Sequence, residues 1–403
     1  MKLLLLLNKL SLLFLVFTSI LNAQEESLLL DGAWELKAIS ADKWMPAEVP
    51  GVVHLDLLNN NVIEDPFYRM NESKVQWIGK EKWEYKRNFE VSESLFNKSQ
   101  IKLFCNGLDT FASVYINDQL VATTNNMHLR YQFDCKPYVK KGSNTIKVVF
   151  DSYVERGLEL HEASPYPIPG QGNDKSTFKE LKDIHIGTYI RKAGYQFGWD
   201  WGPRFLTSGI WRSIYIEGNN VTNIQSVYFK PVGISKKKAN YDIELELDHI
   251  TDKTITAQVK VNGKTKVESD IVLNKKTKAY KIPLSIKKPK FWWPNGMGEA
   301  NLYDIELNLF EGDNLIASHK ERLGVRTIEL VTDPDEQGAS FYFKVNGVPF
   351  FAKGANYIPS DNFLTRVDKE RYLQTIMSSK RSHFNMLRVW GGGIYESDLF
   401  YEL

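Results

Sequence analysis

Short strand-forming runs, cut by turn residues every few positions, constrain the fold of this 403-residue chain more than any other feature. In residues 83–91 and 144–150, apolar and polar side chains alternate. Such alternation predicts strands with one face in a core and the other in water. The pattern recurs in residues 100–105, 112–116, 129–133 and 209–217. Strands at this spacing predict a β-sandwich over residues 24–219.

Residues 1–23 are expected to be a secretory signal peptide. Lys2 and Lys9 make the start positive, residues 10–21 form a short apolar run, and Ala23 is a small residue suited to cleavage. The run is too short, and its flank too polar, for a membrane span. We therefore predict export to the periplasm or the medium, with no membrane span once the signal peptide is removed.

The charge balance argues against nucleic acid as a partner. The chain has 51 basic and 49 acidic residues and a net charge of +2, so no basic footprint is expected. Its seven histidines lack metal-ligand spacing, and we expect neither a metal nor another cofactor. The two cysteines, Cys105 and Cys135, are too few for a disulfide framework, and both pairing and two buried thiols stay open.

A second β region is predicted over residues 220–332, after the turn sequence Gly-Asn-Asn at 218–220. Polar alternation along its strands predicts one solvated face. Lysine runs at 236–238 and 275–276 are expected on that face rather than in a binding patch. The expected strands are residues 241–247, 254–261, 279–284 and 302–310.

From residue 333 the pattern changes in kind. A hairpin is predicted around Asn346-Gly347, followed by a strand at 351–357, a helix at 366–382 and a strand at 385–390. Strand, helix, strand is the repeating unit of a parallel sheet. Residues 333–403 are far fewer than the ~250 of a complete (β/α)8 barrel, so we interpret the sequence as a fragment.

The stretch FGWDWGPRF, residues 197–205, places Asp200 between Trp199 and Trp201. An aromatic ring can cover the apolar face of a pyranose, while a carboxylate accepts hydrogen bonds from sugar hydroxyls. The pattern therefore indicates carbohydrate binding. The alternative is an acid pinned inside a turn by neighbouring backbone amides.

Eight stretches in order resemble the β-mannosidases of glycoside hydrolase family 2, and the similarity extends from Asp31 to the last residue. The resemblance implies a jelly-roll sugar-binding sandwich at 24–219, an immunoglobulin-like sandwich at 220–332 and the incomplete start of a TIM barrel at 333–403. The stretches are residues 50–58, 65–72, 75–89, 107–118, 194–205, 291–303, 350–361 and 384–396.

The resemblance also implies an activity, the retaining hydrolysis of terminal non-reducing β-D-mannose residues from β-mannosides. Such enzymes use two glutamates about 5–5.5 Å apart, an acid/base and a nucleophile. In the family these follow the fourth and seventh barrel strands, so both are expected beyond Leu403. We assign no catalytic residue here and predict that the 403 residues alone do not turn over substrate.

Four substrate-binding residues follow from the resemblance. Asp200 matches the acid that reaches the bound sugar from the first domain, and Trp199 is favoured over Trp201 as the indole lining the pocket. Arg388 matches the arginine beside the nucleophile, where a cation keeps that carboxylate ionised. Trp390 is expected against the sugar ring. An ordinary ion pair for Arg388 and packing under the glycine-rich loop for Trp390 are the structural alternatives.

Three further polar residues are weaker candidates. Asn356 and Asp361 lie near the end of the first expected barrel strand. Glu396 is a nearby carboxylate, but it is expected to begin a helix and to interact with the helix dipole.

Two other functions stay open. The chain could belong to a sister enzyme on the same scaffold, such as an exo-β-glucosaminidase, a β-galactosidase or a β-glucuronidase. It could also be a non-catalytic carbohydrate-binding protein, although the strand-helix-strand unit near the C-terminus argues against that.

Overall fold

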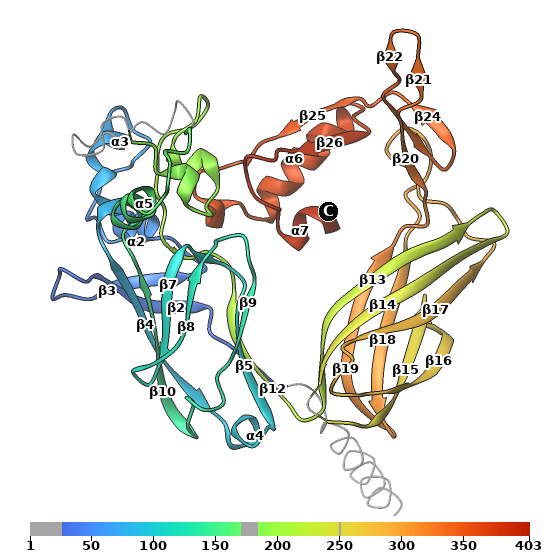
Figure 1. Cartoon of the computed structure of the whole chain (residues 1–403), viewed down its shortest axis with the longest axis horizontal. Coiled ribbons are helices and arrows are strands. Elements are labelled where there is room, and N and C mark those ends of the chain that lie inside the picture. Colours follow the sequence, from blue (N-terminus) through green and yellow to red (C-terminus); the bar gives the residue numbers. More distant parts are fainter. Residues whose placement is uncertain (1–25, 171–183, 250) are drawn as a thin grey trace, which may run out of the picture. The chain divides into compact units, whose positions relative to one another are not determined.

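The computed structural model describes residues 26–170, 184–249 and 251–403 (Figure 1). The predicted signal peptide at residues 1–23 lies outside these ranges. The described chain divides into two compact units. The first contains residues 27–218, 294–296 and 351–403, and the second contains residues 219–293 and 297–350.

The first unit is built on a β-sandwich of two sheets. The larger sheet contains, in spatial order, β3 (Met45–Val49), β2 (Gly32–Ala38), β4 (Trp83–Val91), β10 (Gly142–Phe150), β7 (Phe111–Ile116) and β8 (Gln119–Asn125). The smaller sheet contains β1 (Glu26–Leu29), β12 (Ile214–Asn219), β5 (Gln100–Cys105) and β9 (Tyr131–Asp134). A short pair, β6 (Leu108–Asp109) and β11 (Gly209–Ile210), lies beside them.

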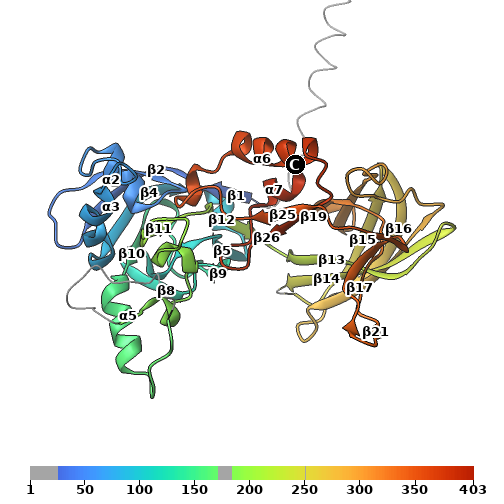
Figure 2. The same ribbon diagram turned by 90° about the horizontal axis from the view of Figure 1, so that it is seen from above.

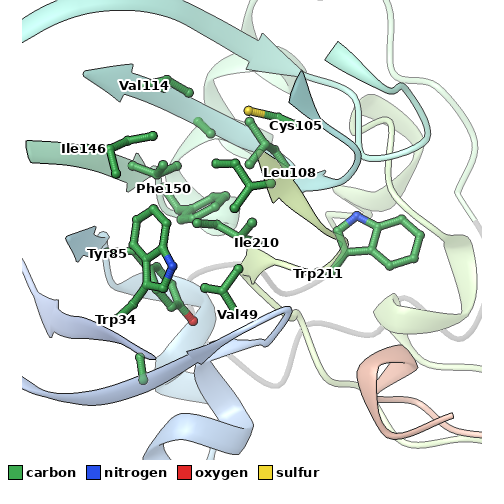
Figure 3. Close-up of a cluster of buried hydrophobic side chains, with 14 of the residues drawn as sticks. Trp34, Val49, Tyr85, Cys105, Leu108, Val114, Ile146, Phe150, Ile210 and Trp211 are labelled. Carbon is green, nitrogen blue, oxygen red and sulfur yellow. The ribbon is translucent and has the colours of Figure 1, made fainter. Parts of the chain in front are cut away.

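Alternate residues of these strands form one core, as the sequence pattern predicts. Trp83 and Tyr85 on β4 are fully buried, and the ring of Tyr85 meets Phe150 of β10 edge to face at 5.8 Å. Figure 3 shows Trp34, Tyr85 and Phe150 converging in this core. The Trp34 indole keeps a partner there, because its Nε1 donates to the carbonyl of Leu30 at 2.8 Å.

Cys105 and Cys135 are buried in the same core as free thiols. Burial raises the pKa of the Cys135 thiol to about 12 and raises that of Cys105 further. Of the two possibilities left open by the sequence, the structure has the buried thiols.

Short helices connect the strands of the sandwich. Where a serine precedes the helix, its side chain caps it: Ser152 accepts from the Glu155 amide at 3.2 Å, and Ser92 accepts from the Leu95 amide at 3.0 Å. The helices are α2 (Val53–Asn59), α3 (Asn71–Lys74), η1 (Gln76–Lys80), α4 (Glu93–Phe96), α5 (Tyr153–Glu162), η3 (Gly187–Tyr189) and η4 (Gly194–Phe197).

The second unit contains another β-sandwich. Its core is formed by alternate residues such as Ile243 and Leu245 on one sheet and Ala257 and Val259 on the other. The predicted solvated face is present, since the residues between them are more exposed. One sheet contains β13 (Thr222–Ile234), β14 (Lys238–His249) and β17 (Ala279–Lys287). The other contains β16 (Lys264–Val272), β15 (Thr254–Val261), β18 (Tyr303–Glu311) and β19 (Asn314–Leu323).

The predicted Asn346-Gly347 hairpin is present, with β23 (Tyr342–Val345) and β24 (Val348–Phe350) on either side. Both turn residues have positive φ, 51° and 77°, as a type I′ turn requires. β23 also pairs with β20 (Ile328–Val331), so this small sheet extends across the boundary predicted after residue 332. A second short hairpin, β21 (Pro334–Asp335) with β22 (Gly338–Ala339), lies between them in the sequence.

The C-terminal segment of the first unit contains a parallel strand pair with a helix between its strands. β25 (Gly354–Tyr357) pairs in parallel with β26 (Met386–Val389), and α6 (Lys369–Arg381) connects them. A turn of helix, η5 (Leu364–Arg366), precedes α6, and α7 (Asp398–Glu402) follows β26.

Helix α6 begins later than the predicted residue 366, because Asp368 caps it by accepting from the Arg371 amide at 2.9 Å. Figure 2 shows α6 lying against β25 and β26. Tyr372 of α6, Tyr357 of β25 and Phe400 of α7 form the small core between these elements.

Candidate functional site

The Trp-Asp-Trp motif forms a tight turn. The Trp199 amide donates to the Gly202 carbonyl at 3.1 Å, and the Gly202 amide donates back to the Trp199 carbonyl at 3.4 Å. Asp200 and Trp201 are therefore the tip. Gly198 leads into the turn with φ of +98°, a conformation that residues with a side chain rarely adopt. We call residues 199–202 the Trp-Asp-Trp turn.

The Asp200 carboxylate is exposed at the tip of this turn. Within the described parts of the chain it forms neither a hydrogen bond nor an ion pair. The alternative raised by the sequence, an acid pinned by neighbouring amides, is therefore not the observed geometry there. A free carboxylate is available to accept hydrogen bonds from a ligand.

Both indoles of the turn contact a third, Trp390. The Trp199 and Trp390 ring centroids are 5.1 Å apart at an interplanar angle of 69°, and those of Trp201 and Trp390 are 5.9 Å apart at 77°. Edge-to-face contacts of this kind are favourable for aromatic pairs. The ring of Trp201 also packs against the buried ring of Tyr195, with centroids 5.2 Å apart. The three indoles form one aromatic group beside Asp200, in which Trp199 and Trp390 are half-buried and Trp201 is exposed.

Trp390 is placed by the end of β26 and by the glycine-rich loop after it. Its amide donates to the Tyr357 carbonyl at 2.9 Å, which continues the parallel pairing one residue past the strand. A Cβ at Gly392 would lie 2.3 Å from the indole of Trp390, so the backbone there packs directly on the ring. The packing alternative for Trp390 and contact with the Trp-Asp-Trp turn are thus both present.

Arg388 lies two residues before Trp390, and its side chain is exposed. Its Nη1 donates to Oδ1 of Asn356 at 3.1 Å, across the register that pairs these two residues of β26 and β25. The described residues form no ion pair with Arg388, so the ion-pair alternative is not observed among them. Asn356, a weaker candidate, orients the guanidinium.

Asp361 and Glu396 have structural partners. Asp361 accepts from the Phe363 amide at 2.8 Å and forms an ion pair with Arg366 at 2.6 Å. Glu396 is buried and accepts from the Tyr372 hydroxyl at 2.5 Å, and burial raises the pKa of its carboxyl. The expectation that Glu396 begins a helix is wrong, because α7 begins at Asp398.

Comparison with known proteins decides the family. Residues 34–212 match "Glycosyl hydrolase 2 galactose-binding domain-like", and residues 222–326 match "Glycosyl hydrolases family 2". The chain belongs to glycosyl hydrolases family 2. Its two sandwiches are the galactose-binding-like and immunoglobulin-like domains of that family, which confirms the resemblance seen in the sequence.

Relatives in family 2 include enzymes named β-mannosidase. The chain is 33% identical to that of Mus musculus over 386 residues, which cover 93% of the chain and 43% of the relative. It is 35% identical to that of Bos taurus over 392 residues, which cover 94% of the chain and 44% of the relative. The chain therefore spans less than half the length of these curated relatives.

Solved structures show the same fold. The β-D-mannosidase of Dictyoglomus thermophilum superposes with a TM-score of 0.87 at 39% identity, over 94% of this chain and 46% of that one. The exo-chitosanase CsxA of Amycolatopsis orientalis superposes with a TM-score of 0.71 at 21% identity, over 94% and 42% of the two chains. The second likeness concerns the fold alone.

The family 2 sandwich holds the C-terminal segment through contacts that sequence reasoning missed. Phe363 is fully buried and stacks on Phe205 at 5.3 Å, with Phe67 and His54 also against its ring. The neighbouring Asn362 donates from Nδ2 to the Pro203 carbonyl at 3.0 Å. His54, Phe67 and Phe205 lie inside stretches that carry the family resemblance, which was the available signal.

His54 belongs to this contact as a neutral aromatic ring. Burial lowers its pKa to about 3, with the charge of Lys192 adding to the effect. A neutral imidazole can pack at 5.7 Å and 5.5 Å from the rings of Phe205 and Phe363 without a buried charge.

The far end of the FGWDWGPRF stretch is fixed by hydrogen bonds to the segment before β4. The Arg204 amide donates to Oε1 of Glu72 at 2.8 Å, and its Nη1 donates to Oε1 of Gln76 at 2.7 Å. Gln76 in turn donates to the Arg204 carbonyl at 2.8 Å. The Trp-Asp-Trp turn is therefore an exposed tip on a well-anchored stretch.

Neither a metal cluster nor a membrane helix is present in the described ranges. Among residues 26–170, 184–249 and 251–403 there is no group of three or more His, Cys, Asp or Glu placed to hold a metal ion. No helix in those ranges is both long and apolar enough to pass through a bilayer.

Proposed function

We propose that this chain is part of a β-mannosidase that removes terminal non-reducing β-D-mannose residues from β-mannosides with retention. The free carboxylate of Asp200, at the tip of a turn whose indoles meet Trp390, is the observation that carries the proposal. Relatives named β-mannosidase, at 33% and 35% identity over more than nine-tenths of the chain, support it.

The proposed roles follow from the chemistry of each side chain. Asp200 accepts hydrogen bonds from sugar hydroxyls, and charged acceptors make the stronger bonds of this kind. Trp199 and Trp390 present aromatic surface to the apolar face of the sugar ring. Arg388, oriented by Asn356, supplies a cation that lowers the pKa of a nearby nucleophilic carboxylate.

The bond-breaking chemistry is proposed to lie outside these residues. β25, α6 and β26 are proposed as the first elements of a (β/α)8 barrel, within a domain that begins at residue 333. The acid/base and the nucleophile are proposed to follow later barrel strands, so no residue of this chain is given a catalytic role. Export, on the basis of the leader at residues 1–23, is part of the proposal.

Ligand binding by the 403-residue chain tests the proposed function. Saturation-transfer NMR would compare methyl β-D-mannoside with methyl β-D-galactoside, β-D-glucosaminide and β-D-glucuronide. We expect the mannoside to bind best, and Asp200→Ala to weaken it by about 10- to 150-fold, the loss of a hydrogen bond to a charged group worth ~1.5–3 kcal/mol. Asp42→Ala, at an exposed acid of the same sandwich, is the matched control.

Other results of these measurements would contradict the proposed function or favour a different enzyme of the family. Unchanged mannoside affinity in Asp200→Ala contradicts the role of the turn. Preference for the glucosaminide favours an exo-β-glucosaminidase, the activity named for a neighbour that shares this fold. The same chain is expected to release no aryl alcohol from an aryl β-mannoside, and measurable turnover would contradict the placement of the catalytic glutamates.

A further inference from the structure

A buried ion pair lies at the base of the loop that carries the Trp-Asp-Trp turn. The Lys192 ammonium contacts Oδ2 of Asp109, and the two side chains are 0% and 1% exposed. Lys192 also donates to the carbonyl of Thr207 at 2.8 Å and to its Oγ1 at 2.9 Å. The Thr207 hydroxyl donates to Oδ2 of Asp109 at 2.7 Å.

Every charged atom in this group has partners. The three protons of the ammonium are accepted by Asp109 and by the two oxygens of Thr207. The second carboxylate oxygen, Oδ1 of Asp109, accepts from the hydroxyls of Tyr153 at 3.0 Å and Thr110 at 2.6 Å. Full satisfaction is what allows two charges to remain buried.

These contacts join the two ends of the loop formed by residues 192–207. Lys192 and Thr207 are the two ends of the segment that contains the Trp-Asp-Trp turn. The Lys192 ammonium donates to the backbone carbonyl and to the side-chain hydroxyl of Thr207. Asp109 ends β6 and pairs with Gly209 of β11 just beyond the loop. The ion pair thus links both ends of the loop to β6.

Stability alone is a weak reason for such a pair. The cost of removing two charges from water offsets most of their attraction, so uncharged residues of similar size often serve equally well. What apolar residues cannot reproduce is the set of hydrogen bonds to Thr207. An apolar side chain at position 192 has no donor for the Thr207 carbonyl, and the two loop ends lose their link.

We propose that Asp109 and Lys192 are positioning residues that hold the Trp-Asp-Trp turn against Trp390 in the arrangement that binds sugar. The positioning follows from the contacts above, and the sugar part rests on the proposed function. Both side chains are buried, 0% and 1% exposed, so neither is assigned a contact with the ligand. Asp109 and Lys192 act through the loop ends at 192 and 207.

Hydrogen exchange of the 403-residue chain measures the positioning directly. In the double variant Asp109→Asn with Lys192→Met, the new amide oxygen at position 109 can accept from the hydroxyls of Tyr153 and Thr110, and its NH2 group can donate to the Thr207 hydroxyl oxygen. No charge is then buried alone, and the hydrogen bonds that Lys192 donates to Asp109 and to the carbonyl and hydroxyl oxygens of Thr207 are lost. We expect peptides covering residues 195–206 to exchange at least about tenfold faster, and peptides of β4 to exchange at the original rate.

Two further variants serve as controls for the double variant. Lys192→Met alone leaves the Asp109 charge buried without a counter-ion, so we expect faster exchange throughout the sandwich. Asn144→Ala removes another buried polar group of the sandwich, which bonds Lys140 and Gly142 and does not contact the loop. In this variant we expect the exchange rate of residues 195–206, compared with that of β4, to be the same as in the original chain.

The inference is overturned if residues 195–206 exchange at the original rate in the double variant, or if β4 accelerates equally. Methyl β-D-mannoside affinity then separates the two proposals. If residues 195–206 exchange faster in the double variant, but the mannoside affinity is unchanged in that variant and in Asp200→Ala, the positioning is upheld and the sugar role of the turn is rejected. Weakened affinity in Asp200→Ala with an unchanged loop in the double variant upholds the sugar role and rejects the positioning.

Discussion

The indole rings of Trp199 and Trp390 meet nearly edge to face, with centroids 5.1 Å apart, although one belongs to a turn of the sandwich and the other follows β26. Trp201 meets the same ring at 5.9 Å. Trp390 therefore connects the Trp-Asp-Trp turn to the C-terminal segment through two aromatic contacts. Both contacts depend on this single side chain.

Removing the Trp390 indole should loosen the connection without unfolding the sandwich. Trp390→Ala loses two aromatic pairs at a half-buried site, so we expect a stability loss of about 1–3 kcal/mol, less than for a fully buried tryptophan. Urea denaturation measures the loss of stability, and near-UV circular dichroism reports the loss of the aromatic contacts. Trp390→Phe should recover part of the stability and part of the near-UV signal. Equal losses of stability in Trp390→Ala and Trp390→Phe would contradict the aromatic contact.

Phe363 should be among the most sensitive positions of the C-terminal segment. Its ring is 0% exposed between Phe205, Phe67 and His54, so Phe363→Ala should cost about 3–5 kcal/mol. Phe351→Ala is the matched control, because that ring is 82% exposed and should change stability by no more than about 0.5 kcal/mol. Similar losses in both variants would contradict the observed packing.

Arg388 should contribute little to stability. Its guanidinium is exposed and its hydrogen bond to Asn356 is at the surface, so Arg388→Ala should change the free energy of unfolding by no more than about 0.5 kcal/mol. Thermal denaturation measures the change. A loss above about 1 kcal/mol would identify Arg388 as a structural residue and remove the reason to place it in a binding site.

The buried carboxyl of Asp56 should make stability depend on pH. Burial raises its pKa from 3.8 to about 7, against the opposing hydrogen bonds from Tyr85 and the Glu48 amide. Between those values the folded chain holds a proton that the unfolded chain has lost, so the free energy of unfolding falls as pH rises, by about 4 kcal/mol at most. Above pH 7 the loss is complete.

Asp56→Asn tests that dependence, since the amide keeps an acceptor for the Glu48 amide and does not titrate. Urea denaturation at pH 5 and pH 8 should show a smaller difference for the variant than for the original chain. Parallel pH profiles for the two proteins would contradict a raised pKa at Asp56.

The two thiols should be unreactive in the folded chain. Cys105 and Cys135 are buried, and burial raises both pKa values, so little thiolate forms at pH 8. A chromogenic disulfide reagent should detect neither thiol before denaturation and both in guanidinium chloride. Rapid reaction of the folded chain would contradict their burial.

Much of the fold could be predicted from local patterns. Strands β4 and β10 follow directly from alternation at 83–91 and 144–150, and the hairpin turn follows from Asn346-Gly347, because period and turn chemistry are properties of neighbouring residues. The pairing of β20 with β23 did not follow, since a strand's partner is chosen by tertiary packing. That choice carried a sheet past the boundary expected after residue 332.

The candidate site divides in the same way. Asp200 between two tryptophans was visible as a local motif, and the turn that exposes it depends on residues within a few positions. The contacts with Trp390 and the burial of Glu396 against Tyr372 involve elements distant in the sequence. The Asp109–Lys192 pair gave no signal at all, because a lysine looks solvent-exposed until the fold surrounds it.

Residue types and short spacings along the chain predicted its β character, its two sandwiches and the acid between two indoles, and the resemblance of eight ordered stretches predicted its family. Three other features emerged only when the sheets packed together. The two cysteines became separate buried thiols, Trp390 closed on the turn, and a buried lysine tied the loop ends together. Each of these depends on which distant residues the fold brings into contact, and no local pattern in the sequence specifies that.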